Sequence, residues 1–431
     1  MIAQRALLIA AVAIAFAGCS NSGGSGVPGV LSLPGQTVTL PEVSQKGKGA
    51  QWVQFLPKTL GASYSAIVPG PDGNMWFIDE TGGGLVRMSL SGATKEFRLS
   101  SVLQGNAVSL AVGADGKFYI LDESSNVVVV TKAGTAVSIP IPSGDNTSID
   151  GLAPGPDGNV WFAEFNHYAK ITPSGKITEF PYPSGYSTNQ YGGVTTGSDG
   201  NVWLAESSNN AIGRIVPSTG AITMFTDPVE CEPAPLVLGN DGNVWFACLA
   251  NEPSIGSVTP SGGFANYPIG GSFNFNETEQ FCERGPDGEP WCASANDNTV
   301  FRIDTTAHTV TTYTPPLGSE SRPDAVAAGP DGNVWLDTAG APGDIDVLIP
   351  NPLKVKPNKL AFGATGQMQN LMVTEQGTSS WTARSSDTGV ATVGAGGSNA
   401  TFTVRSVGAG SCKITISDGA GNSVAVKVTV S

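Results

Sequence analysis

Basic residues and histidines are scarce in this 431-residue sequence. Charged residues make up 13% of the chain, and 22 Lys and Arg stand against 36 Asp and Glu, for a net charge of −14. A field of this sign does not attract a phosphate backbone, which excludes nucleic acid as a partner. The two histidines, His167 and His308, cannot supply a three-histidine zinc site. No glycine-rich segment matches a phosphate-binding loop before a helix, so no nucleotide cofactor is expected.

Long apolar runs are also absent, apart from one at the start of the chain. After Arg5, the run from Ala6 to Ala17 is too short to span a bilayer, and it is followed by Gly18 and Cys19. This is an export signal, and its end resembles the lipobox of bacterial lipoproteins, with Phe16 where Leu is usual. We therefore predict a signal peptide at 1–18, a lipid anchor on Cys19, and a place in the bacterial cell envelope, facing the periplasm or the cell surface. The alternative is an ordinary secretory signal with an incidental cysteine.

Glycine and proline are abundant, and their distribution divides the chain. The sequence has 56 Gly and 30 Pro, which is typical of turn-dense all-β proteins and excludes a helical bundle. Residues 19–49 are rich in Gly, Ser and Pro with little periodicity, so we predict a flexible tether there.

A repeated Asp-Gly turn organises residues 50–350. Segments such as GPDGNVWF recur seven times at intervals of 42 to 46 residues, each between β-prone runs. Two further short strands follow each turn, so every repeat predicts a four-stranded antiparallel blade, and seven repeats predict a closed β-propeller. The aromatic residue four positions after each aspartate is expected to pack between blades. The turn aspartates are Asp72, Asp115, Asp157, Asp199, Asp241, Asp287 and Asp331.

The seventh repeat lacks a fourth strand, and the start of the propeller region provides a replacement. The segment Gln51-Trp-Val-Gln-Phe-Leu-Pro aligns with the fourth strand Ile177-Thr-Glu-Phe-Pro of another repeat. We therefore expect Phe55 to lie in the last strand of blade seven, where the N-terminal strand closes the ring.

Residues 351–431 leave the repeat and form a second predicted domain. Short alternating strands include Thr401-Phe-Thr-Val-Arg and Val424-Ala-Val-Lys-Val-Thr-Val, which predict a small β-sandwich. The stretch from Trp381 to a Val-Ala-Thr-Val segment, then a Gly-rich turn and closing strands, resembles bacterial group 2 immunoglobulin-like domains. The predicted fold class is all-β, a seven-bladed β-propeller followed by a small immunoglobulin-like β-sandwich.

The blade sequences resemble the streptogramin (virginiamycin B) lyase family. The segments GPDGNVWFAE, IGRI and ITEFP carry the resemblance, which covers about Gln51 to Pro350. It implies opening of a cyclic depsipeptide by elimination, with a divalent metal held by carboxylate and a histidine base seven residues before the turn aspartate. None of the seven residues at that −7 position is His. At position +7, where the family has Glu, four blades keep a carboxylate.

Carboxylates at these two positions are the candidate metal ligands. Positions −7 and +7 are expected to lie opposite each other, which would pair Asp150 with Glu164 in blade three. With the others they would form an acidic rim able to hold Mg²⁺ or Ca²⁺. The alternative is that these groups merely solvate a loop-rich face. The candidates are Asp150, Glu164, Glu206, Asp122, Asp79 and Asp324.

Four cysteines cluster in blades five and six, as suits an oxidising compartment. Three pairings are possible, and we favour two disulfides within blades, Cys231 with Cys248 and Cys282 with Cys292. Cys412 is then a buried thiol of the C-terminal domain.

Two classes of function remain open. We favour a lipid-anchored binding or scaffold protein whose propeller mouth takes a small-molecule, peptide or glycan ligand, because proton abstraction needs a group that titrates near the working pH and no −7 histidine provides one. The alternative is a metal-dependent streptogramin B lyase or a related lyase or hydrolase, so enzyme status stays open. His167 follows Asp157 by ten residues and His308 lies near a fourth strand, and both are interpreted as surface residues.

Overall fold

The computed structural model describes most of the propeller and of the C-terminal domain. The described residues are 31–33, 36–38, 45–46, 50–55, 64–80, 82–144, 151–186, 193–229, 231–248, 254–268, 280–315, 322–338, 345–350, 354–374, 381–394, 400–418 and 423–431. The predicted signal peptide, Cys19 and most of the predicted tether lie outside them. No helix in the described part of the chain is long and apolar enough to cross a membrane.

Seven sheets, each with the four antiparallel strands of one blade, form the propeller, which confirms the all-β class and the blade pattern. Blade 1 contains β5 (Tyr64–Pro69), β6 (Met75–Asp79), β7 (Gly84–Met88) and β8 (Thr94–Arg98), and blade 2 contains β9 (Ala107–Val112), β10 (Phe118–Asp122), β11 (Asn126–Val130) and β12 (Ala136–Pro140). Blade 3 contains β13 (Leu152–Pro154), β14 (Val160–Ala163), β15 (His167–Ile171) and β16 (Ile177–Pro181). Blade 4 contains β17 (Val194–Thr196), β18 (Val202–Glu206), β19 (Ala211–Val216) and β20 (Ala221–Thr226). A single 3-10 turn, η1 (Ser207–Asn209), is the helical element of the described residues.

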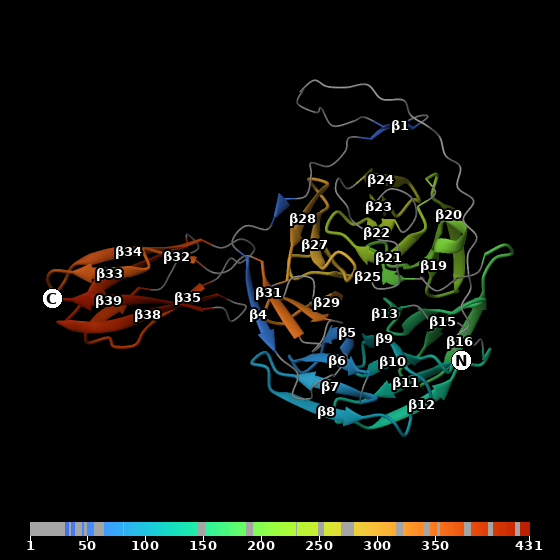
Figure 1. Cartoon of the computed structure of the whole chain (residues 1–431), viewed down its shortest axis with the longest axis horizontal. Helices are drawn as coiled ribbons and strands as arrows, with labels where there is room; N and C mark the ends of the chain where they lie inside the picture. The colour runs from blue at the N-terminus through green and yellow to red at the C-terminus, as the bar shows by residue number, and fades with distance from the viewer. Residues whose placement is uncertain are drawn as a thin grey trace, which may run out of the picture. The chain divides into compact units, whose positions relative to one another are not determined.

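Blades 5 to 7 follow the same order. Blade 5 contains β21 (Pro233–Leu238), β22 (Val244–Cys248), β23 (Ser254–Val258) and β24 (Phe264–Pro268), and blade 6 contains β25 (Gln280–Arg284), β26 (Pro290–Ser294), β27 (Thr299–Asp304) and β28 (Thr309–Tyr313). Blade 7 contains β29 (Pro323–Ala328), β30 (Val334–Thr338) and β31 (Ile345–Ile349), and its fourth strand is β4 (Gln51–Phe55). The first strand of each blade contacts the first strand of the next, from β5 round to β29 and back to β5. The first strands therefore surround the middle of the ring, with the outer strands at its rim (Figure 1).

The Asp-Gly turns fix the aromatic core between blades. In blade 1, the Trp76 indole N–H donates to Asp72 at 2.9 Å, and Gly73 has a φ of 73°, which favours glycine. The same indole bond recurs at each tryptophan repeat, and in blade 2 the Tyr119 hydroxyl replaces it. Trp76 is fully buried, stacks on Phe97 of its own blade and packs at a tilt against Phe118 of blade 2. The prediction that these aromatics pack between blades is confirmed.

The N-terminal strand β4 closes the ring as predicted. It pairs antiparallel with β31, with Phe55 opposite Ile345. The Phe55 ring stacks on Trp335 at 5.6 Å between centroids. One pairing was not expected from the sequence: β3 (Gln45–Lys46), inside the predicted tether, adds in parallel to β28 at the outer edge of blade 6. The hairpin of β1 (Leu31–Leu33) and β2 (Gln36–Val38) belongs to a separate N-terminal unit.

The C-terminal domain consists of two four-stranded sheets around one apolar core. The first has the order β32-β34-β37-β36 and the second β33-β39-β38-β35. Leu371, Phe402 and Ile414 belong to the shared core cluster, and Cys412 is buried in it as a free thiol. This arrangement is a β-sandwich, and its immunoglobulin-like character stays a prediction. The strands are β32 (Lys354–Lys356), β33 (Lys359–Phe362), β34 (Met368–Thr374), β35 (Trp381–Ser385), β36 (Ala391–Val393), β37 (Thr401–Ser406), β38 (Gly410–Asp418) and β39 (Ser423–Val430).

Candidate functional site

The candidate site lies at the end of the propeller opposite the Asp-Gly turns, which we call the mouth. Strands alternate in direction, so the start of each first strand, the end of each second strand and the loop after it meet at this end. The −7 and +7 residues belong to these segments. Asp150 lies outside the described residues, so its pairing with Glu164 stays a prediction.

The predicted −7 to +7 register holds in one blade and is wrong in four. In blade 6, Gln280 lies opposite Ser294, as expected. In blades 1, 2, 5 and 7 a register shift within the hairpin brings position −8 opposite +7. The reason is a β-bulge, which places an extra residue on one strand and which an alignment of repeats does not reveal. In blade 7 the shift lies between Pro323 and Val326, so Thr338 at +7 lies opposite Pro323 and not opposite Asp324.

Three of the candidate carboxylates bind backbone N–H groups of the propeller itself. Asp79 accepts from the Gly82 N–H at 2.8 Å. Asp122 is fully buried and accepts from the Ser124, Asn126 and Gln104 N–H groups at 3.0 to 3.1 Å. Glu206, also fully buried, accepts from the Asn209 N–H at 3.1 Å and so caps the N-terminal end of η1. At these three positions the +7 carboxylate stabilises the loop that follows its strand.

Glu164 lies beside one of the two histidines. It is 1% exposed and accepts from the Ser143 hydroxyl of the preceding blade at 2.9 Å. The Glu164 N–H donates to the carbonyl of His167, at the start of β15, at 2.8 Å. His167 is therefore at the mouth. His308 lies in the β27–β28 turn at the opposite end, with its ring 4.4 Å from that of Tyr267.

The candidate carboxylates that the structure describes do not converge on one point, and the predicted metal site stays a prediction. Four of the predicted ligands come from four different blades, and their oxygens accept bonds from the protein. No group of three His, Cys, Asp or Glu side chains within the described ranges lies close enough together to hold a metal ion. A hard cation such as Mg²⁺ or Ca²⁺ requires several convergent oxygen ligands.

Blade 7 brings together carboxyl groups that the sequence analysis missed. Asp337 is fully buried, its Oδ1 accepts from the Ala325 N–H, and its Oδ2 has no hydrogen-bond partner among the described residues. Burial, followed by the negative charges of Asp324 and of Glu80 from blade 1, raises the pKa of Asp337 well above its usual range. Comparison of position +6 across the repeats could have found it. The other six residues there are apolar: Ile78, Leu121, Ala163, Ala205, Ala247 and Ala293.

Glu283 is a second carboxyl that breaks the repeat. It lies on the first strand of blade 6, opposite Trp291, at a position where the other blades have Val, Ala or Thr. Its side chain is exposed, but the protein atoms that surround it in the middle of the ring remove part of its hydration. This desolvation raises the pKa of Glu283 to about 7, against a smaller opposing effect of the Arg284 N–H. Among the described first strands, Glu283 is thus a carboxyl whose pKa is raised by its surroundings.

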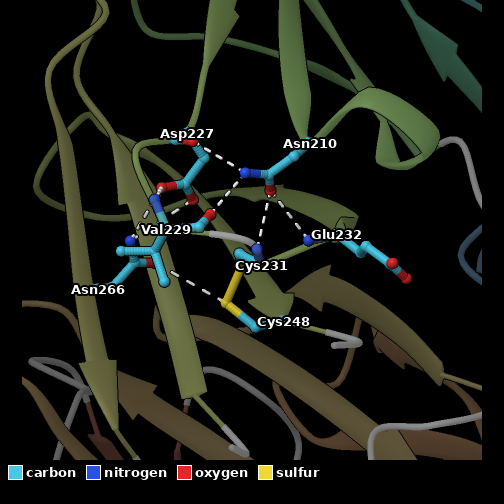
Figure 2. Close-up of a disulfide and its surroundings, with 7 residues drawn as sticks. All are labelled: Asn210, Asp227, Val229, Cys231, Glu232, Cys248 and Asn266. Atoms are coloured by element: carbon cyan, nitrogen blue, oxygen red, sulfur yellow. Dashed lines mark hydrogen bonds between the residues drawn. A yellow bond between two sulfur atoms is a disulfide. The ribbon is translucent and has the colours of Figure 1, made fainter. Parts of the chain in front are cut away.

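Blade 5 replaces the +7 carboxylate with a disulfide. Cys248 is at +7 and bonds to Cys231 in the loop that enters the blade, and Cys282 bonds to Cys292 in blade 6, so both favoured pairings are confirmed. Figure 2 shows Asn210 beside the first disulfide, where its amide oxygen accepts from the Cys231 and Glu232 N–H groups at 2.9 and 3.0 Å. Covalent and hydrogen bonds together fix this part of the mouth.

Comparison with known proteins identifies the family. A model described as the virginiamycin B lyase family matches residues 42–191 and 185–347. The chain belongs to the virginiamycin B lyase family. The two matched ranges together cover the seven blades and end before the β-sandwich.

Solved structures share the propeller fold, whereas no curated protein matches the chain. A streptogramin B lyase structure is 24% identical, with a TM-score of 0.62 over 71% of this chain and 99% of its own. A catalytically inactive virginiamycin B lyase from Staphylococcus aureus with quinupristin is 25% identical, with a TM-score of 0.60 over 69% and 99%. The extracellular domain of a putative hybrid two-component system from B. thetaiotaomicron is 14% identical, with a TM-score of 0.51 over 91% of this chain and 58% of its own.

This virginiamycin B lyase family member departs from the family pattern at its mouth. The −7 residues, where the resemblance implies a histidine, are Ser65, Val108, Asp150, Gly192, Ala234, Gln280 and Asp324. The +7 residues of blades 5, 6 and 7 are Cys248, Ser294 and Thr338, so no carboxylate remains at that position there. The ring of blades is kept, but this side-chain pattern is not.

Proposed function

We propose that this chain is an exported, lipid-anchored binding protein of the virginiamycin B lyase family without streptogramin B lyase activity. A small-molecule, peptide or glycan ligand binds at the mouth. A metal-dependent elimination needs a base that titrates near the working pH and a set of free metal ligands. No −7 residue is a histidine, and Asp79, Asp122 and Glu206 are bound to the propeller's own loops.

The observation that carries the binding role is the buried Asp337. A carboxyl oxygen without a hydrogen-bond partner is costly to bury, and such groups gather at functional sites. Asp324 and Glu80 add negative charge to the same place. A ligand that offers an ammonium group or several N–H donors to the blade 7 and blade 1 carboxyl groups would offset this cost.

A lyase reaction with Glu283 as the base is the second candidate. A carboxylate with a pKa of about 7 can accept a proton at neutral pH, which is the role that the missing histidine leaves open. Glu283 is at position −4, three residues along the first strand from position −7. The backbone of Glu283 therefore lies about 10 Å along the strand from the −7 residue. A substrate would therefore have to enter further into the ring.

Turnover of quinupristin with Mg²⁺ distinguishes the two candidates. We expect no opened product by liquid chromatography, under conditions in which the Staphylococcus aureus lyase opens the compound completely. Chromatography is needed because elimination within a ring yields an isomer of unchanged mass. Opening that is lost in Glu283→Gln, a substitution that keeps the shape of the side chain, would contradict the binding role and establish the lyase.

The lipid anchor predicts a covalent modification at Cys19. Cells that express the chain in the presence of labelled palmitate should incorporate the label into the parent protein and not into Cys19→Ser. Cys412→Ser is the matched control and should be labelled like the parent, because Cys412 is a buried thiol of the C-terminal domain. An unlabelled parent would mean that the leader is an ordinary secretory signal.

A further inference from the structure

The C-terminal β-sandwich carries the opposite charge to the rest of the chain. Residues 351–431 contain seven basic and three acidic residues, a net charge of +4, so the preceding 350 residues carry −18. The basic residues are Lys354, Lys356, Lys359, Arg384, Arg405, Lys413 and Lys427. A basic domain on an acidic chain indicates an anionic partner for that domain.

Strand pairing aligns three of these lysines in one row. Lys359 on β33 lies opposite Lys427 on β39, and Lys427 lies opposite Lys413 on β38. All three side chains are exposed and belong to the outer face of this sheet, because their neighbours Leu360, Val428 and Ile414 point into the core. Adjacent strands are about 4.8 Å apart, so the lysine row crosses three strands within about 10 Å.

The rest of this outer face favours contact with an extended anionic surface. Exposed Arg384 on β35 extends the positive charge, and the exposed neighbours Thr382, Ser411 and Ala425 have short side chains. Over the described residues, none of the three lysines or Arg384 forms an ion pair within the protein. Like charges directly opposite each other destabilise a sheet, so the row has a cost in the isolated domain. An external anion would remove that cost.

We propose that the outer face of the β33-β39-β38-β35 sheet binds the anionic headgroups of a lipid bilayer through Lys359, Lys427 and Lys413. Lysine ammonium groups act as flexible point charges and suit a diffuse layer of phosphates, whereas a defined planar ligand is usually recognised by arginine. The exposed apolar side chain Ala425 on this face is small, so the contact is electrostatic. This inference is independent of the propeller ligand and of acylation.

The test uses vesicle sedimentation of the chain from Ser20 onward, which lacks the predicted signal and acylated cysteine. Vesicles of phosphatidylcholine with one third phosphatidylglycerol are compared with pure phosphatidylcholine at physiological ionic strength. We expect binding only to the anionic vesicles, and about a hundredfold weaker partitioning for the triple variant Lys359→Gln, Lys413→Gln, Lys427→Gln. The triple variant should melt no lower than the parent, since the substitutions relieve repulsion between exposed neighbours.

A matched control removes the same charge from the other sheet. Lys354→Gln, Lys356→Gln, Arg405→Gln changes exposed residues of β32 and β37 and should lower partitioning less than about fivefold. Equal loss in both triple variants would show that only net charge matters and would overturn the proposal. The proposal also fails if the parent does not bind anionic vesicles, or if it binds soluble heparin through the row but not the vesicles.

Discussion

Deletion of Gln51–Phe55 should open the propeller and abolish its cooperative unfolding near the parental melting temperature. The strand β4 pairs along five residues with β31, and without it blade 7 exposes an unpaired edge. Phe55 also packs on Trp335 of blade 7 and lies against Gly92 of blade 1, so its loss removes a contact across the ring junction. Burial of a Phe side chain alone contributes about 3–5 kcal/mol in protein cores.

A second deletion is the control that distinguishes the effect of opening the ring from the effect of shortening the N-terminal segment. Removal of Gln45–Lys46 takes away β3, which pairs with the outer edge of blade 6 over only two residues, and should leave the melting temperature nearly unchanged. Near-ultraviolet circular dichroism follows the packed tryptophans in both variants. If the Gln51–Phe55 deletion melts like the parent, β4 does not close the ring.

Asp337→Asn should stabilise the protein at pH 8 by about 1–3 kcal/mol, the usual cost of a buried polar group without a partner. The pKa of Asp337 is higher in the folded protein than the value of 3.8 expected when unfolded, so the folded state binds this proton more tightly. The contribution of Asp337 to stability is complete below pH 3.8 and is lost as the pH rises through its folded pKa. Asn keeps the shape and carries no charge, so the advantage of the variant should grow from pH 4 to pH 8.

Asp79→Asn is the matched control for this measurement. Asp79 ends the equivalent strand of blade 1 and accepts the Gly82 N–H, so its substitution should give no gain in stability at pH 8. Urea unfolding at several pH values gives both free energies. A constant difference between Asp337→Asn and the parent across this pH range would show that Asp337 does not hold a proton in the folded state.

The sequence was sufficient for the parts of the fold that depend on local pattern. The Asp-Gly turn recurs because each aspartate accepts a hydrogen bond from the N–H or O–H of the aromatic residue four positions later. The regular spacing of these turns along the sequence was therefore enough to locate all seven blades. Phe55 revealed the closing strand because it occupies the aromatic position of a fourth strand. The disulfides followed because Cys282 and Cys292 flank one turn at equal distance.

The features that could not be predicted from the sequence depend on strand register and on contacts between blades. A bulge shifts position −8 opposite +7, and no local signal marks it. Asp337 is influenced by Glu80, which lies in blade 1 at the other end of the repeat array. The lysine row required the parallel pairing of β33 with β39, which joins strands more than 60 residues apart. Ring closure and sheet order bring these residues together, and periodicity alone does not specify either.

The most direct test is the melting temperature in millimolar Mg²⁺ or Ca²⁺, compared with that in NaCl of equal ionic strength. It shows whether the mouth carboxylates hydrogen-bond the propeller's own loops or bind a metal ion. A cation bound only by the folded state would add about 2.7 kcal/mol at one hundred times Kd. We predict no rise, because Asp122 and Glu206 are buried and accept bonds from the protein. A rise that disappears in Asp150→Asn with Glu164→Gln would contradict this and would show a metal centre in blade 3.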